Sequence, residues 1–291
     1  MRLFCFGFGY SARTLAAHLP LPGPHIVGTC RDPGAAPPIA GVDLVAFNGL
    51  SPLAPHDRQC LRHATHILLS IPPAEDGDPV LALHAADIAA AGACRWIGYL
   101  SSTGVYGDHK GAWVDEATAP RPRTARARRR LAAERAWQAL AARHGLPLHI
   151  FRLAGIYGPG RNAFMALKSG RAHRIISPGH VSSRIHVADL AAVILASMAQ
   201  PRPGAIYNVC DDMPASPADV VAYAAARMGV VAPPPTALEE AGLSAFARSF
   251  YSESRRVSNR RIRDELGVRL RYPDYRSGLD ALWKSEIAGG T

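Results

Sequence analysis

The chain has 291 residues, of which 48% are hydrophobic and 19% charged, a composition that excludes a disordered polypeptide and predicts a soluble globular protein with a sizeable core. Its net charge of +10 comes almost entirely from arginine, because Lys110, Lys168 and Lys284 are the only lysines. No DNA-reading motif or aromatic-interleaved basic stretch accompanies this charge, so we expect an anionic cofactor and no nucleic-acid partner.

The cysteines and the apolar runs indicate the cellular compartment. Five cysteines without CxxC spacing predict buried free thiols in a reducing compartment and provide no metal-ligating set. No apolar run reaches ~18 residues, so we expect no membrane span. The short apolar start, MRLFCFGFGYSA, is interrupted by glycine and fits a strand better than a signal peptide. We therefore expect a cytoplasmic protein.

Short apolar runs alternate with alanine-rich stretches in the first half of the chain, which predicts β-α-β units in a parallel sheet covered on both faces. The predicted strands are 2–6, 25–30, 44–47, 66–71, 96–101, 148–153 and 205–210. The predicted helices are 10–18, 57–63, 80–91, 126–143, 187–199 and 217–228. Residues 157–184 are predicted to form a Gly/Arg-rich loop, and the residues after 228 an irregular tail with a loop or boundary at 232–235.

A glycine motif follows the first predicted strand and opens the first predicted helix. In FGFGYSA, Gly7 permits a tight turn, Gly9 lets the backbone approach a pyrophosphate, and Ala12 allows close packing of helix and strand. The alternative, a glycine-rich hairpin, fits the strand–loop–helix order less well. The predicted dinucleotide-binding residues in this part of the chain are Gly7, Gly9, Tyr10, Ser11, Ala12 and Ser70.

The tip of the second predicted strand bears on the choice between NADP and NAD. An NAD site places a carboxylate there for the ribose hydroxyls, whereas this chain has Cys30 followed by Arg31, which could pair with a 2′-phosphate. Asp32 comes next and argues the other way, and a solvent-facing arginine without a ligand is a third possibility. We expect NADP in preference to NAD.

Further motifs occur in a fixed order along the rest of the chain: YLSSTGVYGD (99–108), FRLAGIYGPGRN (151–162), SRIHVADLA (183–191), IYNVCDD (206–212) and ELGVRLRYPDYRSGL (265–279). With the glycine motif, they resemble the extended short-chain dehydrogenase/reductase superfamily of the NAD(P)-dependent epimerase/dehydratase type. The resemblance implies an α/β fold with a doubly wound Rossmann core (1–155, with a returning segment 186–212). It also implies a smaller C-terminal substrate region (156–185 and 213–291) and, at family level, a possible homodimer.

The resemblance also implies catalytic positions. The family binds the substrate oxygen with a Ser or Thr at the place of Ser102, with Thr103 beside it. Its Tyr and Lys form Y-x-x-x-K, followed four residues later by a Glu that corresponds to Glu134. Counting back places Arg130 at the Lys position and Arg126 at the Tyr position.

The missing tyrosine does not depend on the alignment, because no tyrosine lies between Tyr106 and Tyr157. A guanidinium cannot exchange a proton near neutral pH as an activated phenol does. Arg130 could still bind the nicotinamide ribose or simply face solvent, and Arg126 fits a solvent-facing position better than an anion clamp. The possible replacement proton donors are Tyr106, Thr103, Asp108, His109, Glu116 and His186. Of these, Tyr106 is chemically nearest, although packing at the site wall is its more ordinary role.

Two arginines are predicted to contact an anionic group of the substrate. Sugar-nucleotide members of the family have an Arg four residues before the His of I-H-V, and that position is Ser182 here. Arg184 follows two residues later, and Arg161 lies in the GPGRN loop; both could equally be solvated loop arginines. We expect a substrate smaller than a nucleotide sugar.

Two functions follow from these predictions. One is an NADP-dependent oxidoreductase or epimerase-like enzyme that uses Ser102, Thr103 and a relocated proton donor on a small carbonyl or hydroxyl compound. The other is a catalytically silent NADP-binding protein that acts as a sensor or binds a partner.

Overall fold

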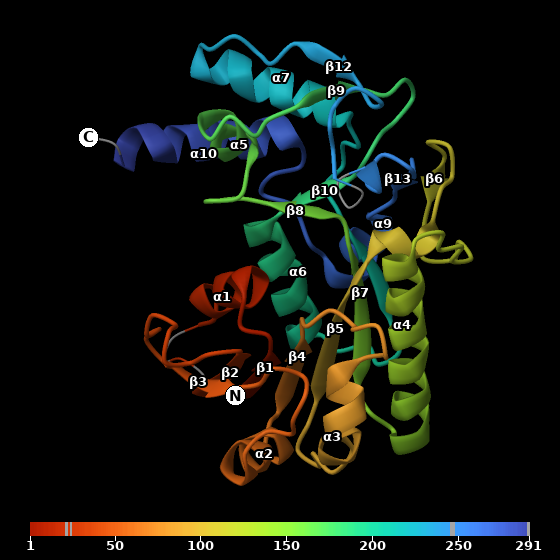
Figure 1. Cartoon of the computed structure of the whole chain (residues 1–291). Helices are drawn as coiled ribbons and strands as arrows, with labels where there is room; N and C mark the ends of the chain where they lie inside the picture. The colour runs from red at the N-terminus through yellow and green to blue at the C-terminus, as the bar shows by residue number, and fades with distance from the viewer. Residues whose placement is uncertain (21–22, 24, 245–247, 290–291) are drawn as a thin grey trace.

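A seven-stranded parallel sheet runs through the computed structural model, which describes residues 1–20, 23, 25–244 and 248–289 (Figure 1). Its strands, in spatial order, are β11 (Ile206–Val209), β7 (Leu148–Leu153), β5 (Trp96–Ser102), β4 (His66–Leu69), β1 (Arg2–Phe6), β2 (His25–Cys30) and β3 (Val42–Ala46). The chain reverses its direction across the sheet between β1 and β4. In doubly wound folds, ligands bind at the carboxyl ends of the strands beside such a reversal. The predicted Rossmann fold is therefore confirmed.

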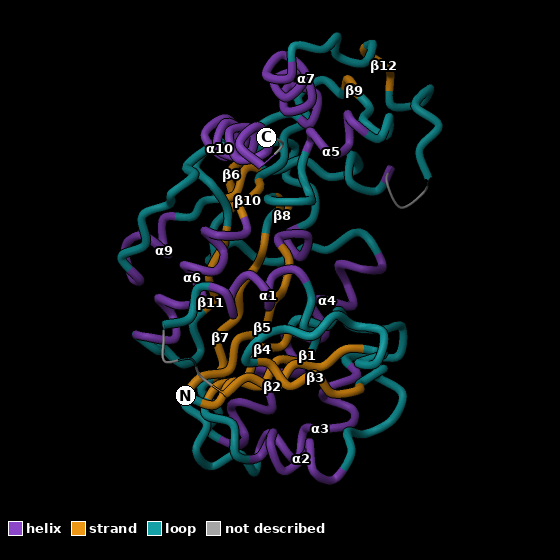
Figure 2. Tube along the Cα trace, turned by 90° about the vertical axis from the view of Figure 1, so that its left-hand side faces the viewer, coloured by secondary structure: helices purple, strands orange, loops and turns teal. Residues whose placement is uncertain are grey.

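Helices cover both faces of this sheet, as Figures 1 and 2 show. Alternation along β1 explains why, because Leu3 and Cys5 enter one core cluster while Phe4 and Phe6 enter the other. The first cluster includes residues of α1 and α6, and the second includes residues of α2, α3 and α4. The helices are α1 (Tyr10–Ala17), α2 (Pro55–Arg62), α3 (Pro79–Ala89), α4 (Ala125–His144) and α6 (Val187–Ala199). None of the helices in the described part of the chain is both long and apolar enough to cross a membrane.

Small elements form the end of the molecule beyond the carboxyl edge of the sheet, at the top of Figure 1. They include three parallel strand pairs: β8 (Gly155–Tyr157) with β10 (Arg184–His186), β9 (Arg174–Ile176) with β12 (Pro235–Ala237), and β6 (Trp113–Val114) with β13 (Arg256–Val257). The helical elements there are η1 (Thr103–Tyr106), α5 (Ala163–Lys168), α7 (Pro217–Met228) and α10 (Tyr275–Gly289), whereas α9 (Arg260–Leu266) packs on the face of the sheet beside β11 and α6.

Several predicted elements have the observed bounds, including 2–6, 25–30, 148–153, 187–199 and 217–228. The prediction of a plain loop over 157–184 was wrong, because α5, β9 and the first residue of β10 lie there. The prediction of an irregular tail was also wrong, since β12, β13, α9 and α10 form in it. Strands of two or three residues that pair with distant segments leave no periodic pattern to detect.

A buried ion pair joins α4 to the sheet. The Nη2 of Arg152, on β7, lies 2.8 Å from the Oε2 of Glu134, on α4, and both side chains are almost fully buried. Glu134 also accepts a hydrogen bond from the Ser101 hydroxyl on β5. The Nη1 of Arg152 donates to the Tyr106 hydroxyl (3.0 Å), which donates in turn to Oδ1 of Asn208 (2.8 Å). The network thus fixes α4, η1 and three neighbouring strands relative to one another.

Replacing Arg152 with Met should lower the free energy of unfolding by about 3–5 kcal/mol, because it leaves the Glu134 carboxylate buried without its cation. Urea denaturation would measure this change. The exposed pair Arg260–Asp264 is the control, and Asp264→Asn should cost less than about 1 kcal/mol. A loss below about 1 kcal/mol for Arg152→Met would show that the network does not hold α4 to the sheet.

Candidate active site

The glycine loop between β1 and α1 is held from two sides. Gly7 has φ +85°, and a Cβ there would lie 2.8 Å from the Ser70 Oγ, so only glycine fits. The Gly7 amide donates to Thr29 Oγ1 on β2 (2.8 Å). The Ser70 hydroxyl, just past β4, donates to the carbonyls of Phe6 (3.0 Å) and Gly7 (2.5 Å). Ser70 therefore holds the glycine loop in place through these two hydrogen bonds.

The amino terminus of α1 is open. Among the described residues, no side chain caps α1 and no heavy atom would come within 4 Å of a Cβ on Gly9. Five other helices, α3 to α7, are capped by side chains: Asp78, Thr124, Asn162, His186 and Ser216. Helix-terminal amides without a cap attract anions such as phosphates. Ala12 is buried beneath this end, and Ser11 is half-buried in the first turn.

Two residues at the tip of β2 have different surroundings. Arg31 is exposed. Asp32 is also exposed, but its Oδ1 accepts hydrogen bonds from the amides of Gly34 (3.0 Å) and Ala35 (3.2 Å). One oxygen of the Asp32 carboxylate is thus committed to the local turn.

The three predicted catalytic residues lie at the end of β5 in different settings. Ser102 is half-buried, and its Oγ accepts a hydrogen bond from the Gly104 amide (3.1 Å) at the start of η1. Thr103 is buried. Tyr106 is fully buried, its hydroxyl is held by Arg152 and Asn208, and burial raises the pKa of its phenol. This arrangement favours the packing role for Tyr106 over proton exchange.

The arginines of α4 turn toward neighbouring segments. The Nη1 of Arg130 donates to the Leu100 carbonyl (2.9 Å) and to the Tyr99 hydroxyl (3.2 Å), so its guanidinium faces β5. The guanidinium of Arg126 lies over the Phe250 ring, 4.7 Å from its centroid. Partial burial and then the neighbouring charge of Arg130 lower the pKa of Arg126. Both arginines thus contribute positive charge to the first turns of α4.

Three of the other predicted proton donors accept hydrogen bonds from backbone amides. Asp108 accepts from the Ser254 amide (2.9 Å), Glu116 from the Asn208 amide (2.7 Å), and His186 from the Ala188 amide (3.2 Å). Their positions favour structural roles.

The C-terminal segment brings two residues to this edge that sequence reasoning missed. Arg255 donates to the Gly107 carbonyl (2.6 Å) and forms an ion pair with Oε2 of Glu253 (2.9 Å). A Cβ on Gly104 would lie 3.3 Å from Ser102 Oγ and 4.0 Å from Arg255 Nη2, so both side chains border the space above Gly104. Glu253 is largely buried, and its Oε1 has no partner among the described residues. No local pattern marks these residues, because about 150 residues separate them from Ser102.

The structure separates the two predicted substrate arginines. Arg161 is exposed and lies 5.9 Å from the ring centroid of Tyr10, whose hydroxyl donates to the Pro159 carbonyl (3.0 Å). Arg161 therefore lies beside the glycine loop. Arg184 begins β10 and donates to the Ala215 carbonyl (3.0 Å), within the C-terminal region.

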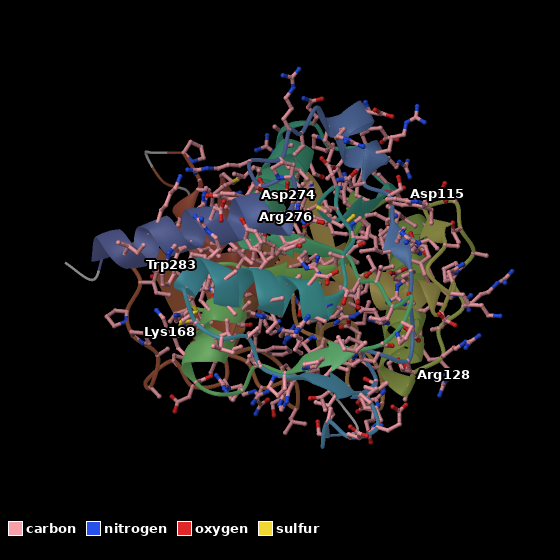
Figure 3. The ribbon with its side chains drawn as sticks, turned by 90° about the horizontal axis from the view of Figure 1, so that it is seen from above. Asp115, Arg128, Lys168, Asp274, Arg276 and Trp283 are labelled. Atoms are coloured by element: carbon pink, nitrogen blue, oxygen red, sulfur yellow. The ribbon has the colours of Figure 1, made fainter. Side chains whose placement is uncertain are left out.

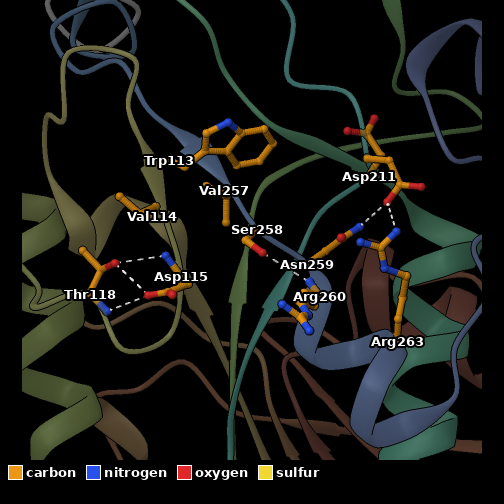
Figure 4. Close-up of a pocket in the computed structure, with 11 residues that line it drawn as sticks. Trp113, Val114, Asp115, Thr118, Asp211, Val257, Ser258, Asn259, Arg260 and Arg263 are labelled. Carbon is orange, nitrogen blue, oxygen red and sulfur yellow. Dashed lines mark hydrogen bonds and ion pairs between the residues drawn. The ribbon is translucent and has the colours of Figure 1, made fainter.

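A hollow of about 560 Å³ lies beside β6, β13 and the start of α9 (Figure 4). Asp212 accepts hydrogen bonds there from Asn259 Nδ2 (2.7 Å) and Arg263 Nη1 (3.3 Å). None of the predicted site residues lines this hollow, and we assign it no ligand.

Comparison with known proteins agrees with this arrangement. Residues 80–210 match the NAD dependent epimerase/dehydratase family. The chain is 30% identical over 284 residues to Protein YeeZ of Escherichia coli K12, covering 92% of this chain and 95% of YeeZ. The chain therefore belongs to the NAD dependent epimerase/dehydratase family. The glycine loop lies outside the matched residues, so its identification depends on its own geometry.

Solved structures extend the comparison. A functionally unknown conserved protein from Silicibacter pomeroyi DSS is 52% identical, with a TM-score of 0.89 and coverage of 97% of this chain and 98% of that one. UDP-glucuronic acid 4-epimerase from Bacillus cereus, solved in complex with NAD, is 16% identical, with a TM-score of 0.76 and coverage of 100% and 99%. At that identity the second likeness shows the fold alone.

Gly9→Ala should weaken NADPH binding about tenfold or more while leaving the unfolding temperature unchanged. Its Cβ meets no described protein atom but occupies space that an approaching pyrophosphate needs. Gly92→Ala is the matched control, since it too meets no described atom and lies away from the loop. Fluorescence titration with NADPH measures both; equal affinity in the two variants would contradict the assigned cofactor position.

Proposed function

We propose that the protein is an NADP(H)-dependent oxidoreductase or epimerase/dehydratase-type enzyme acting on a small carbonyl or hydroxyl compound. One observation carries this proposal: the open amino terminus of α1 and the Ser102 hydroxyl share the carboxyl edge of a single sheet, on either side of the β1–β4 reversal. The residues present fit a dinucleotide, because Gly9 leaves room for a pyrophosphate and the first amides of α1 face it without a side-chain cap. When bound, the nicotinamide accepts or supplies a hydride.

Different residues at this edge would bind the cofactor, position α4 and bind the substrate. The amides of Tyr10 and Ser11 would hold the pyrophosphate, and Arg130 would keep the start of α4 against β5 through the Leu100 carbonyl. The Ser102 hydroxyl would donate a hydrogen bond to the substrate oxygen. The guanidinium groups of Arg126 and Arg130 would supply positive charge at this edge without moving a proton. The largely buried carboxylate of Glu253, paired with Arg255, would add a negative charge to the same edge.

A second candidate function is NADP binding without turnover, as a sensor or as part of a complex. The observation that favours it is the pair of arginines on α4, because neither can replace the proton transfer of a Tyr–Lys pair. The substrate screen below separates the two functions.

Ser102→Ala should reduce turnover of carbonyl compounds with NADPH about 100-fold or more, since one positioned donor to a developing oxyanion is worth roughly 10²–10³ in rate. NADPH affinity should stay unchanged. Ser252→Ala, an exposed hydroxyl of the C-terminal segment, is the control and should keep full activity. Activity that survives Ser102→Ala would refute the site, and a wild type that binds NADPH but turns over no compound would support the second function.

Arg31→Ala should weaken NADPH binding about 10- to 100-fold and leave NADH binding unchanged, because a charge-assisted hydrogen bond to the 2′-phosphate contributes roughly 1.5–3 kcal/mol. Fluorescence titration with both cofactors makes the comparison, and the exposed Arg128 of α4, replaced by Ala, is the control. Equal losses for the two cofactors would contradict the role of Arg31. A wild type that binds neither cofactor would contradict both proposed functions.

A further inference from the structure

A cavity of about 160 Å³ lies in the C-terminal region, where β8 and β10 meet α5, α7 and α10. Its apolar wall consists of Ala163, Val220 and Leu279. Its polar lining includes Ser182, Arg184 and Tyr275. Figure 3 shows the surrounding helices from above, with Asp274 and Arg276 at the end of α10 that carries Tyr275 and with Trp283 farther along the helix.

Arg184 reaches this cavity with an unused hydrogen-bond donor. Its Nη2 donates to the Ala215 carbonyl (3.0 Å) and contacts the Ser182 hydroxyl oxygen (3.5 Å). Its guanidinium lies over the Tyr275 ring, 5.5 Å from the centroid. Its Nη1 is buried and has no hydrogen-bond partner among the described residues. Burying a charged donor without a hydrogen-bond partner costs free energy. An acceptor bound beside Nη1 would remove this cost, and the described residues do not supply one.

Burial lowers the pKa of Arg184, and the carboxyl group that most opposes this effect is that of Asp211; Asp219, on α7, opposes it less. Asp211 is buried, and its Oδ2 also lacks a hydrogen-bond partner among the described residues. Burial raises the pKa of Asp211 to about 8, while the charge of Arg184 acts in the opposite direction. A buried carboxyl group therefore acts on Arg184, but the Nη1 donor itself stays without a hydrogen-bond partner among the described residues.

We propose that this cavity binds the carboxylate group of a small organic acid, with Arg184 as its cationic anchor. A guanidinium donates well to carboxylate oxygens, and the Ser182 hydroxyl offers a second donor beside it. The three apolar side chains suit a short hydrocarbon part. Because one water occupies roughly 30 Å³ in the liquid, the cavity holds a molecule of about five heavy atoms, the size of propionate.

The cavity lies close to the reaction edge along the chain. Gly155, which lines it, comes two residues after Leu153, and Leu153 is the register partner of Ser102 on the neighbouring strand. We infer that the bound acid is the substrate, or part of it. This last step rests on the proposed function, whereas carboxylate binding itself does not.

The test is the rise in unfolding temperature of the full chain with increasing sodium propionate at constant ionic strength, since a ligand of the native state raises it. Propionamide, equal in shape but neutral, and inorganic phosphate are the comparison ligands. Arg184→Met and Val220→Phe are the test variants: the first removes the cation, and the second fills the cavity while leaving Arg184 in place. Arg276→Met is the matched control, because Arg276 contacts the hydroxyl of the same Tyr275 but does not line the cavity.

We expect propionate to stabilise the wild type and Arg276→Met, and both test variants to bind it at least tenfold more weakly. Propionamide and phosphate should stabilise much less. The cooperative unfolding transition of each variant without ligand serves as the check on folding, and the NADPH affinity of the same variants should be unchanged. Propionate binding that survives either test variant, or phosphate binding tighter than propionate, would overturn the proposal. Loss of propionate binding in both test variants, in a protein that binds no NADPH, would uphold the cavity and refute only the proposed function.

Discussion

The buried ion pair between Glu134 and Arg152 fixes α4, η1 and the end of β5 relative to one another, and the proposed reaction edge depends on this arrangement. Two charges withdrawn from water are stable only when their remaining hydrogen-bonding capacity is met, and here Ser101 and Tyr106 meet it. Because Ser101 precedes Ser102 directly, the contact that anchors α4 also fixes the position of Ser102, the residue proposed to bind the substrate. The first turns of α4 are thereby held beside the end of β5.

The position of α4 determines where its arginine side chains lie. A run of four arginines in five positions would ordinarily be read as a basic surface, yet Arg130 turns inward to β5 and Arg126 packs on Phe250. The C-terminal segment adds Arg255 and Glu253 to the same edge. The site is thus rich in positive charge with a carboxylate embedded in it, an environment suited to anionic ligands.

The Rossmann half could be predicted from sequence because its signals are local. Each of its signals lies within a few residues of sequence. They are the apolar strands, the glycine turn at Gly7 and Glu134, whose spacing aligns α4 with the family pattern. The short strand pairs of the C-terminal region could not be predicted in this way, since β8 and β10 have three residues each and pair across nearly thirty positions. The contact of Arg255 with the Ser102 edge depends on the same long-range folding. The burial of Tyr106 favours a packing role, and burial can be known only from the folded chain.

The most direct test of this account is a crystal structure with NADP⁺ bound. The account predicts pyrophosphate oxygens within about 3 Å of the amides of Tyr10 and Ser11, the 2′-phosphate beside Arg31, and the nicotinamide facing Ser102. A pyrophosphate bound elsewhere, or a nicotinamide directed away from Ser102, would contradict it.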